Sequence, residues 1–232
     1  MAHRSKRMKQ IDQLIGPART YSLEEAIELF KKCPVTKFDQ SVNAALKVGV
    51  DVKKSDQQVS GTVSLPHGTG QKILVAVIAK GDKAKDAQAA GADFVGAEDL
   101  VEKIKAGWTD FSALITTPDM MREVGKLGKV LGPRGLMPTP KAGTVTTDIA
   151  KAVKEIKAGK VEFKVDKTGN INNAVGKISF SKESLLENLM SLFQGIARAK
   201  PASSKGIFFR SLYLSTTMGP GLKIDLQSVA VN

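Results

Sequence analysis

The chain has very few residues of the kinds that build disulfides, metal centres and base-stacking platforms. Its 232 residues include one cysteine, Cys33, and two histidines, His3 and His67. A single cysteine excludes an internal disulfide and is typical of a reducing compartment. These three residues are also too few for a zinc site of the usual kind. Aromatic residues make up only 5% of the chain, which disfavours a platform on which the bases of a single strand stack.

The chain also lacks an apolar run long enough to cross a bilayer. Residues 1–9 are basic, but no apolar segment follows them, so we interpret them as a basic arm and not as a secretory signal. Hydrophobic residues make up 42% of the chain. That content is typical of a globular protein, and the length is sufficient for two modest cores.

Acidic residues are outnumbered by basic ones. The chain has 35 lysines and arginines against 23 acids, a formal charge of +12. This excess indicates a polyanionic partner, most often nucleic acid. A membrane surface is the weaker alternative, because the sequence shows no basic helix with a bulky aromatic opposite face. Residues 1–67 and 160–232 together hold 21 basic and 12 acidic residues, against 14 and 11 in residues 68–159, so we expect the polyanion to prefer the outer segments.

The outer segments show the alternation of half-exposed strands. Strands are predicted at residues 42–50, 59–65, 161–165, 171–180, 207–215 and 222–231. Helices are predicted at 22–34 and at 181–199 from their apolar faces. Ser22 and Glu25 have the spacing of a capping box at the start of the first helix.

The central segment has a different character. Residues 73–79 form a continuous apolar run, as expected of a strand buried on both faces. Further short strands alternate with helices, which predicts βαβ units and a parallel sheet. The sequence therefore predicts an α/β protein with a split domain, 1–67 and 160–232, and an inserted domain, 68–159. The connections contain the predicted hinge residues Pro66, Gly68, Gly70 and Gly159.

The glycine-rich stretch 125–138 invites comparison with a phosphate-binding loop. Its spacing fails the test, because neither Gly125 nor Gly128 is followed five residues later by a second glycine with Lys and Ser/Thr. We interpret the stretch as a rigid Gly/Pro loop with basic edges. The carboxylate pairs Glu24/Glu25 and Glu98/Asp99 stand at predicted helix starts, where the macrodipole favours negative charge. The sequence therefore predicts no catalytic residue, no metal site and no cofactor.

Three segments are candidate contacts for a polymer. The turn containing Thr216, Thr217, Met218 and Gly219 separates two predicted strands and carries no acid, base or thiol. An ordinary hairpin loop is the alternative. Phe38 is either a core residue or a wall of an RNA-facing groove.

In 166–169, which is otherwise a plain turn, Lys167 would pair with a phosphate and Thr168 with ribose oxygens. Asp166 would accept from a 2′-hydroxyl or a base amine. A DNA-binding regulator fits the charge, but the sequence shows no helix-turn-helix or basic zipper.

Several of these motifs occur together in one known family. They are Lys-Phe-Asp at 37–39, Gly-Thr-Val-Ser-Leu-Pro-His-Gly at 61–68, Gly-Ala-Asp-Phe-Val-Gly at 91–96, Leu-Gly-Pro-Arg-Gly-Leu-Met-Pro at 131–138, Phe-Lys-Val-Asp-Lys-Thr-Gly at 163–169 and Thr-Thr-Met-Gly-Pro at 216–220. In this order the sequence resembles, over essentially its whole length, the bacterial-type first protein of the large ribosomal subunit, the family of the mobile stalk beside the exit tRNA.

The resemblance implies a split two-layer α/β domain that binds ribosomal RNA and an inserted Rossmann-like three-layer α/β domain. It implies a stalk that moves as deacylated tRNA leaves, repression of the protein's own mRNA, and a free protein that is a monomer in the cytoplasm or an organelle stroma. The RNA-binding residues that it implies are Lys37, Phe38, Lys164, Asp166, Lys167, Thr168, Ser211, Thr216, Thr217, Met218 and Gly219. Val165 stands where relatives carry a polar residue, and its strand alternation favours an inward side chain.

Overall fold

The computed structural model describes residues 5–16, 19–34, 36–52, 54–204 and 206–229. The chain divides into two compact units: unit 1 contains residues 1–70 and 161–232, and unit 2 contains residues 71–160. Strands and helices occur in both units. The predicted fold class, a split α/β domain with an α/β insert, is confirmed.

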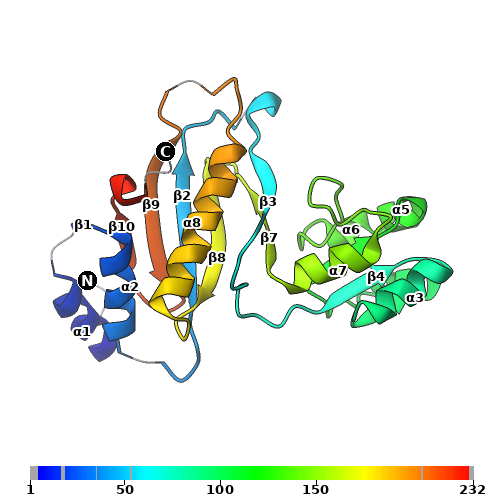
Figure 1. Ribbon diagram of the computed structural model, residues 1–232, viewed down its shortest axis with the longest axis horizontal. Coiled ribbons are helices and arrows are strands. Elements are labelled where there is room, and N and C mark those ends of the chain that lie inside the picture. The colour runs from blue at the N-terminus through cyan, green and yellow to red at the C-terminus, as the bar shows by residue number, and fades with distance from the viewer. Residues whose placement is uncertain (1–4, 17–18, 35, 53, 205, 230–232) are drawn as a thin grey trace. The chain divides into compact units, whose positions relative to one another are not determined.

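Unit 1 is built on a five-stranded sheet in the order β1-β10-β9-β2-β8 (Figure 1). The strands are β1 (Thr20–Tyr21), β2 (Ser41–Val48), β8 (Asn170–Lys177), β9 (Phe209–Thr216) and β10 (Gly221–Ile224). β1 is parallel to β10, and the other neighbouring strands are antiparallel. Because β2 pairs with β8 on one side and β9 on the other, distant segments of the chain meet along this strand.

Helices α2 (Leu23–Lys32) and α8 (Lys182–Arg198) lie over one face of this sheet (Figure 1). Their apolar faces share a core with the buried side of the strands, which includes Val42 and Leu46 of β2. The predicted capping box of α2 is confirmed: Glu25 N donates to Ser22 Oγ and Ser22 N donates to Glu25 Oε2, each at 3.3 Å. Val165 is buried in the same core, as its alternation predicted.

A two-stranded ribbon, β3 (Ser60–Ser64) and β7 (Lys160–Lys164), completes the β-structure of unit 1. The chain then leaves β3 along α8. Asn188 of α8 is fully buried; its Oδ1 accepts from His67 N at 3.1 Å and its Nδ2 donates to Gly68 O at 2.9 Å. Residues 67–68 are therefore held against unit 1, whereas the sequence placed the domain boundary at 67/68.

Unit 2 has three parallel strands in the order β5-β4-β6. They are β4 (Val75–Ile78), β5 (Phe94–Gly96) and β6 (Ala113–Thr116). Alternate residues of β4 enter two separate cores. One core includes α3 (Asp82–Ala89) and α7 (Ile149–Lys157), and the other includes α4 (Glu98–Lys105), α5 (Met121–Gly125) and α6 (Gly128–Leu131). Helices on both faces explain why the predicted strand 73–79 is apolar throughout.

The structure corrects four assignments of local structure. Helix α1 (Lys6–Ile15) begins within the predicted basic arm and continues beyond it, and its Ile11 is fully buried. The stretch 125–138 contains α6 and a turn in place of a plain loop. β8 ends at Lys177, three residues earlier than predicted. β10 ends at Ile224 and a 3₁₀ turn, Leu226–Val229, follows; residues 230–231 of that predicted strand lie outside the described residues.

Candidate nucleic-acid interface

The face of the unit 1 sheet away from α2 and α8 is polar. β2 buries every second residue from Val42 to Val48, so Ser41, Asn43, Ala45 and Lys47 project from the other side. Strand register places six residues of β8 and β9 beside the last three: Asn170, Asn172, Ala174, Ser211, Tyr213 and Ser215. We call these ten residues the open face.

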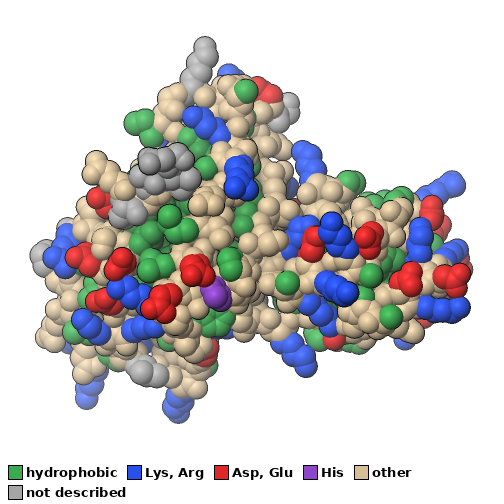
Figure 2. Space-filling model, in the orientation of Figure 1, with side chains coloured by type: hydrophobic (Ala, Val, Ile, Leu, Met, Phe, Trp, Pro, Cys, Tyr) green, Lys and Arg blue, Asp and Glu red, His purple; other side chains and the backbone are tan. Residues whose placement is uncertain are grey.

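The open face forms three rows across three strands. Asn43 lies between Ser215 and Ala174, Ala45 between Tyr213 and Asn172, and Lys47 between Ser211 and Asn170. These rows offer hydroxyls, amides, one phenol and one ammonium group, and no carboxylate. Figure 2 shows the opposite side of unit 1, where Asp/Glu and Lys/Arg side chains are interspersed. The ten open-face positions carry no acid to repel phosphate, whereas α2 and α8 place glutamates on the helical side.

A turn at residues 216–219, the 218 turn, borders the Ser41 end of the open face. Thr217 N donates to Ser41 O at 3.1 Å, and Ser41 N donates to Thr217 Oγ1 at 3.0 Å. Met218 N donates to Gln40 Oε1 at 3.0 Å. These bonds fix the backbone of the turn on β2 while the Met218 side chain remains 53 % exposed.

Two further features shape this end of the open face. Phe38 is 52 % exposed, so it is not a core residue, and the interpretation that remains is a wall of the surface. Arg7 of α1 donates to the carbonyl of Met218. Thr216 is buried, so in this structure its side chain supports the turn from below and does not reach solvent.

A second turn, residues 166–169, borders the Lys47 end, and we call it the 166 turn. Asp166 Oδ1 accepts from Thr168 N at 2.8 Å, Thr168 Oγ1 at 2.7 Å and Asn170 N at 2.9 Å. These hydrogen bonds, from Asn170 first and Thr168 next, lower the pKa of Asp166 to about 2. Through Oδ1, Asp166 therefore holds the turn that carries Lys167 and Thr168, and its predicted contact with RNA stays a prediction.

The sequence-predicted residues fall into two groups. Lys37, Phe38, Thr217, Met218 and Gly219 belong to the Ser41 end of β2. Lys167, Thr168 and Ser211 belong to the Lys47 end, because Ser211 lies opposite Lys47 and Lys47 Nζ donates to Thr168 O. The two ends, at Ser41 and Lys47, are six residue steps apart along β2, about 20 Å. Lys164 is exposed on β7 of the ribbon.

Sequence reasoning missed the residues that connect the two groups: Arg7, Gln40, Asn43, Lys47, Asn170, Asn172, Tyr213 and Ser215. A signal for most of them was present, because they occupy the polar positions of alternating strands. What the alternation cannot show is that β2 lies between β8 and β9, which brings these positions onto one surface.

The chemical groups of this interface are suited to binding a polymer. Among the residues that the structure describes, no group of three or more His, Cys, Asp or Glu could hold a metal ion. None of the described helices is both long enough and apolar enough to cross a membrane. Hydroxyls, amides and lysines are the groups that contact phosphate and ribose, and a rigid arrangement of them recognises the shape of a folded strand.

The fold and this surface define a two-unit α/β protein with a polar, acid-free sheet face between two rigid turns. Comparison with known proteins specifies the family. The model of the Ribosomal protein L1p/L10e family matches residues 29–220, and the chain belongs to this family of ribosomal proteins, not of enzymes.

Full-length relatives agree with this assignment. The chain is 61% identical over 227 residues to large ribosomal subunit protein uL1 of Protochlamydia amoebophila, covering 98% of this chain and 96% of that protein. Proteins of the same name from Kosmotoga olearia and Chlamydia trachomatis serovar D are 54% and 53% identical over 229 residues, with 99% of each chain covered.

Proposed function

We propose that this protein is a structural component of the large ribosomal subunit that binds large-subunit ribosomal RNA through the open face and its two turns. The observation that supports this most directly is the surface itself. A row of hydroxyls and amides without a carboxylate joins two turns whose backbones are fixed by internal hydrogen bonds. Preorganised groups of this kind favour one folded RNA over duplexes of equal charge, because they pay less ordering entropy on binding.

The finer part of the proposal concerns the ribosome in motion. We propose that the protein forms the mobile stalk, contacts the exit-site tRNA and assists release of deacylated tRNA. The two connections between unit 1 and unit 2 then act as hinges. We further propose that the same surface binds the protein's own mRNA and represses translation, and that the protein is a monomer when it is free. Membership of the family and the names of the full-length relatives support this proposal.

The test is binding of the whole protein to the stalk segment of large-subunit rRNA across a salt series. Duplex DNA of equal charge is the competitor. We expect tight binding that the DNA displaces poorly. Equal binding to both polymers would show that the basic surface is generic and would refute the proposal.

A variant pair locates the contact. Met218→Asp places a carboxylate on the exposed 218 turn, and we expect RNA affinity to fall by more than about tenfold through like-charge repulsion. Ile207→Asp is the matched control, because Ile207 is also exposed, at 78 %, and lies outside the open face and both turns. Both variants should keep the parent melting temperature. An unfolded Met218→Asp protein would mean that Met218 is a packing residue.

A further inference from the structure

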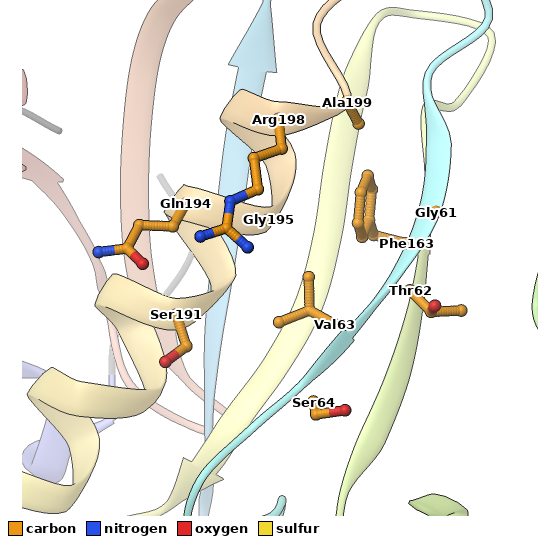
Figure 3. Close-up of a pocket in the computed structure, with 10 residues that line it drawn as sticks. All are labelled: Gly61, Thr62, Val63, Ser64, Phe163, Ser191, Gln194, Gly195, Arg198 and Ala199. Carbon is orange, nitrogen blue, oxygen red and sulfur yellow. The ribbon is translucent and has the colours of Figure 1, made fainter. Parts of the chain in front are cut away.

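A groove of about 520 Å³ lies between α8 and the β3–β7 ribbon, on the side of unit 1 away from the open face. Figure 3 shows ten residues that line it. Val63, Phe163 and Ala199 give it apolar walls. Ser191, Gln194 and Arg198 supply polar groups from α8. None of these residues belongs to the interface described above.

The helix and the ribbon approach closely because of a glycine. A Cβ added to Gly195 would lie 2.0 Å from Val63 Cγ2, which no real contact permits. Ser191, Gln194 and Arg198 surround this contact on α8, spaced at i, i+3 and i+7, so they share one helical face. The helix thus presents a polar stripe beside the ribbon, next to the apolar face that it buries in the core.

The polar stripe is positively charged and unpaired. Arg198 is the one charged residue among those that line the groove. Within the described part of the chain, the side chains of Arg198, Gln194 and Ser191 form no hydrogen bond or ion pair with any other residue. In Figure 3 the Arg198 guanidinium turns back along α8 toward Ser191 and Gln194, as expected from the tilt of helical side chains toward the N-terminus.

These groups match one kind of ligand. A guanidinium offers only donors, while an amide and a hydroxyl can donate alongside it. Three donor groups on one face suit an anion with several oxygens, and Arg is the residue that best fits phosphate. Strand β3 is a further source of donors. Among the described strands it pairs only with β7, so the main-chain N–H groups of its other edge have no strand partner.

We propose that this groove binds a phosphate of an RNA strand, as a second RNA contact on the helical side of unit 1. The groove runs beside residues 61–64 of β3 and residues 191–198 of α8, about 12–13 Å in each case, so it is long enough for an extended backbone. The choice of RNA as the source of the phosphate rests on the proposed function. An acidic peptide is the competing ligand, and the test includes it.

The test compares Arg198→Gln with Lys200→Gln in the whole protein. Both variants lose one positive charge near the end of α8. Lys200 does not line the groove, and its Nζ lies 5.9 Å from the centre of the Phe208 ring. Affinity is measured for the rRNA stalk segment, for unfractionated tRNA and for polyglutamate. The side-chain amide signal of Gln194 is followed by NMR as each probe is added.

We expect Arg198→Gln to weaken binding of one RNA or both by about tenfold, the usual effect of losing a charge-assisted contact. Lys200→Gln should change affinity less than about twofold. The Gln194 signal should shift with RNA in the parent protein. The RNA that loses affinity identifies the source of the phosphate.

Equal effects of the two variants, or an unmoved Gln194 signal, would overturn the groove as a phosphate site. Polyglutamate that binds more tightly than RNA and loses affinity in Arg198→Gln would overturn the choice of RNA. Failure of the proposed function gives a different result. In that case Met218→Asp would leave RNA binding unchanged, while the difference in affinity between Arg198→Gln and Lys200→Gln would still report on the groove.

Discussion

Gly219 shows how one residue sets the shape of the interface. Its N–H donates to Thr216 O at 3.0 Å and closes the 218 turn. A Cβ added to Gly219 would lie 2.1 Å from Thr216 Oγ1, and Thr216 is buried, so it has little freedom to move away. Glycine is therefore required by a side chain beneath the turn and not by the backbone dihedral angle, which is not in the left-handed region.

The close contact between Gly219 and Thr216 predicts a loss of RNA affinity that a second substitution can restore. Gly219→Ala should displace the turn and weaken RNA binding by about tenfold, because Met218 and Thr217 leave their positions. Thr216→Ala removes the clashing hydroxyl, so the double variant should recover most of the loss. The measurement is RNA affinity for the parent, both single variants and the double variant. Additive losses would show that the clash does not govern the turn.

Asp166 illustrates the same principle at the other end of the open face. The sequence shows an acid within a basic segment, and a contact to RNA was the expectation drawn from it. In the structure its Oδ1 accepts three hydrogen bonds from its own turn. Such bonds depend on the turn being formed, so residue type alone could not reveal that Asp166 also fixes the backbone of its own turn.

At the scale of elements, α8 anchors the connection to unit 2. Besides His67 and Gly68, Asn188 Nδ2 also donates to Val175 O of β8 at 2.8 Å. His67 Nε2 lies 2.6 Å from Glu187 Oε2 on the same helix. Gly70 is also close to unit 1, since an added Cβ would lie 2.8 Å from Lys177 Cγ. We therefore propose that rotation on this connection begins after Gly70, beyond all three hinge residues predicted on it, Pro66, Gly68 and Gly70.

Asn188→Ala tests this anchoring. The substitution removes the side-chain partner of three backbone groups, of which Val175 O is buried and His67 N and Gly68 O are partly buried, and we expect it to reduce the free energy of unfolding by about 2–4 kcal/mol. The His67 amide should also exchange its hydrogen faster. Urea unfolding and native-state hydrogen exchange are the measurements. Asn172→Ala, on the exposed side of β8, is the control and should cost less than about 0.5 kcal/mol. Equal losses would mean that Asn188 is dispensable to the connection.

Elements were predictable wherever one local pattern decided them. The capping box at Ser22, the alternation of β2 and the apolar run at 73–79 each indicated the correct structure. Helix α1 was missed because its basic residues were weighed more heavily than the spacing of Met8, Ile11 and Ile15. The interface was only partly predictable. Its turns are local, but the open face exists only after β8 and β9 pair with β2.

At the scale of the whole molecule, charge is divided unequally between the units. Residues 1–70 and 161–232 carry most of the formal charge of +12, and they also contain the open face, both turns and the groove beside α8. Unit 2 has its own two cores and does not need RNA to bury its strands. We therefore expect the affinity for RNA to come from unit 1 and not from unit 2.

This separation predicts which lysines control the salt dependence of RNA binding. Lys167→Gln removes an exposed charge from the 166 turn, and Lys129→Gln removes an exposed charge from α6 of unit 2. Loss of one phosphate contact should reduce the slope of log affinity against log salt by about 0.7 to 0.9. We expect this reduction for Lys167→Gln and no change for Lys129→Gln, measured with the stalk segment of rRNA. Equal slopes for both variants would mean that RNA affinity depends only on the net charge of the protein. That result would contradict the open face as the binding surface.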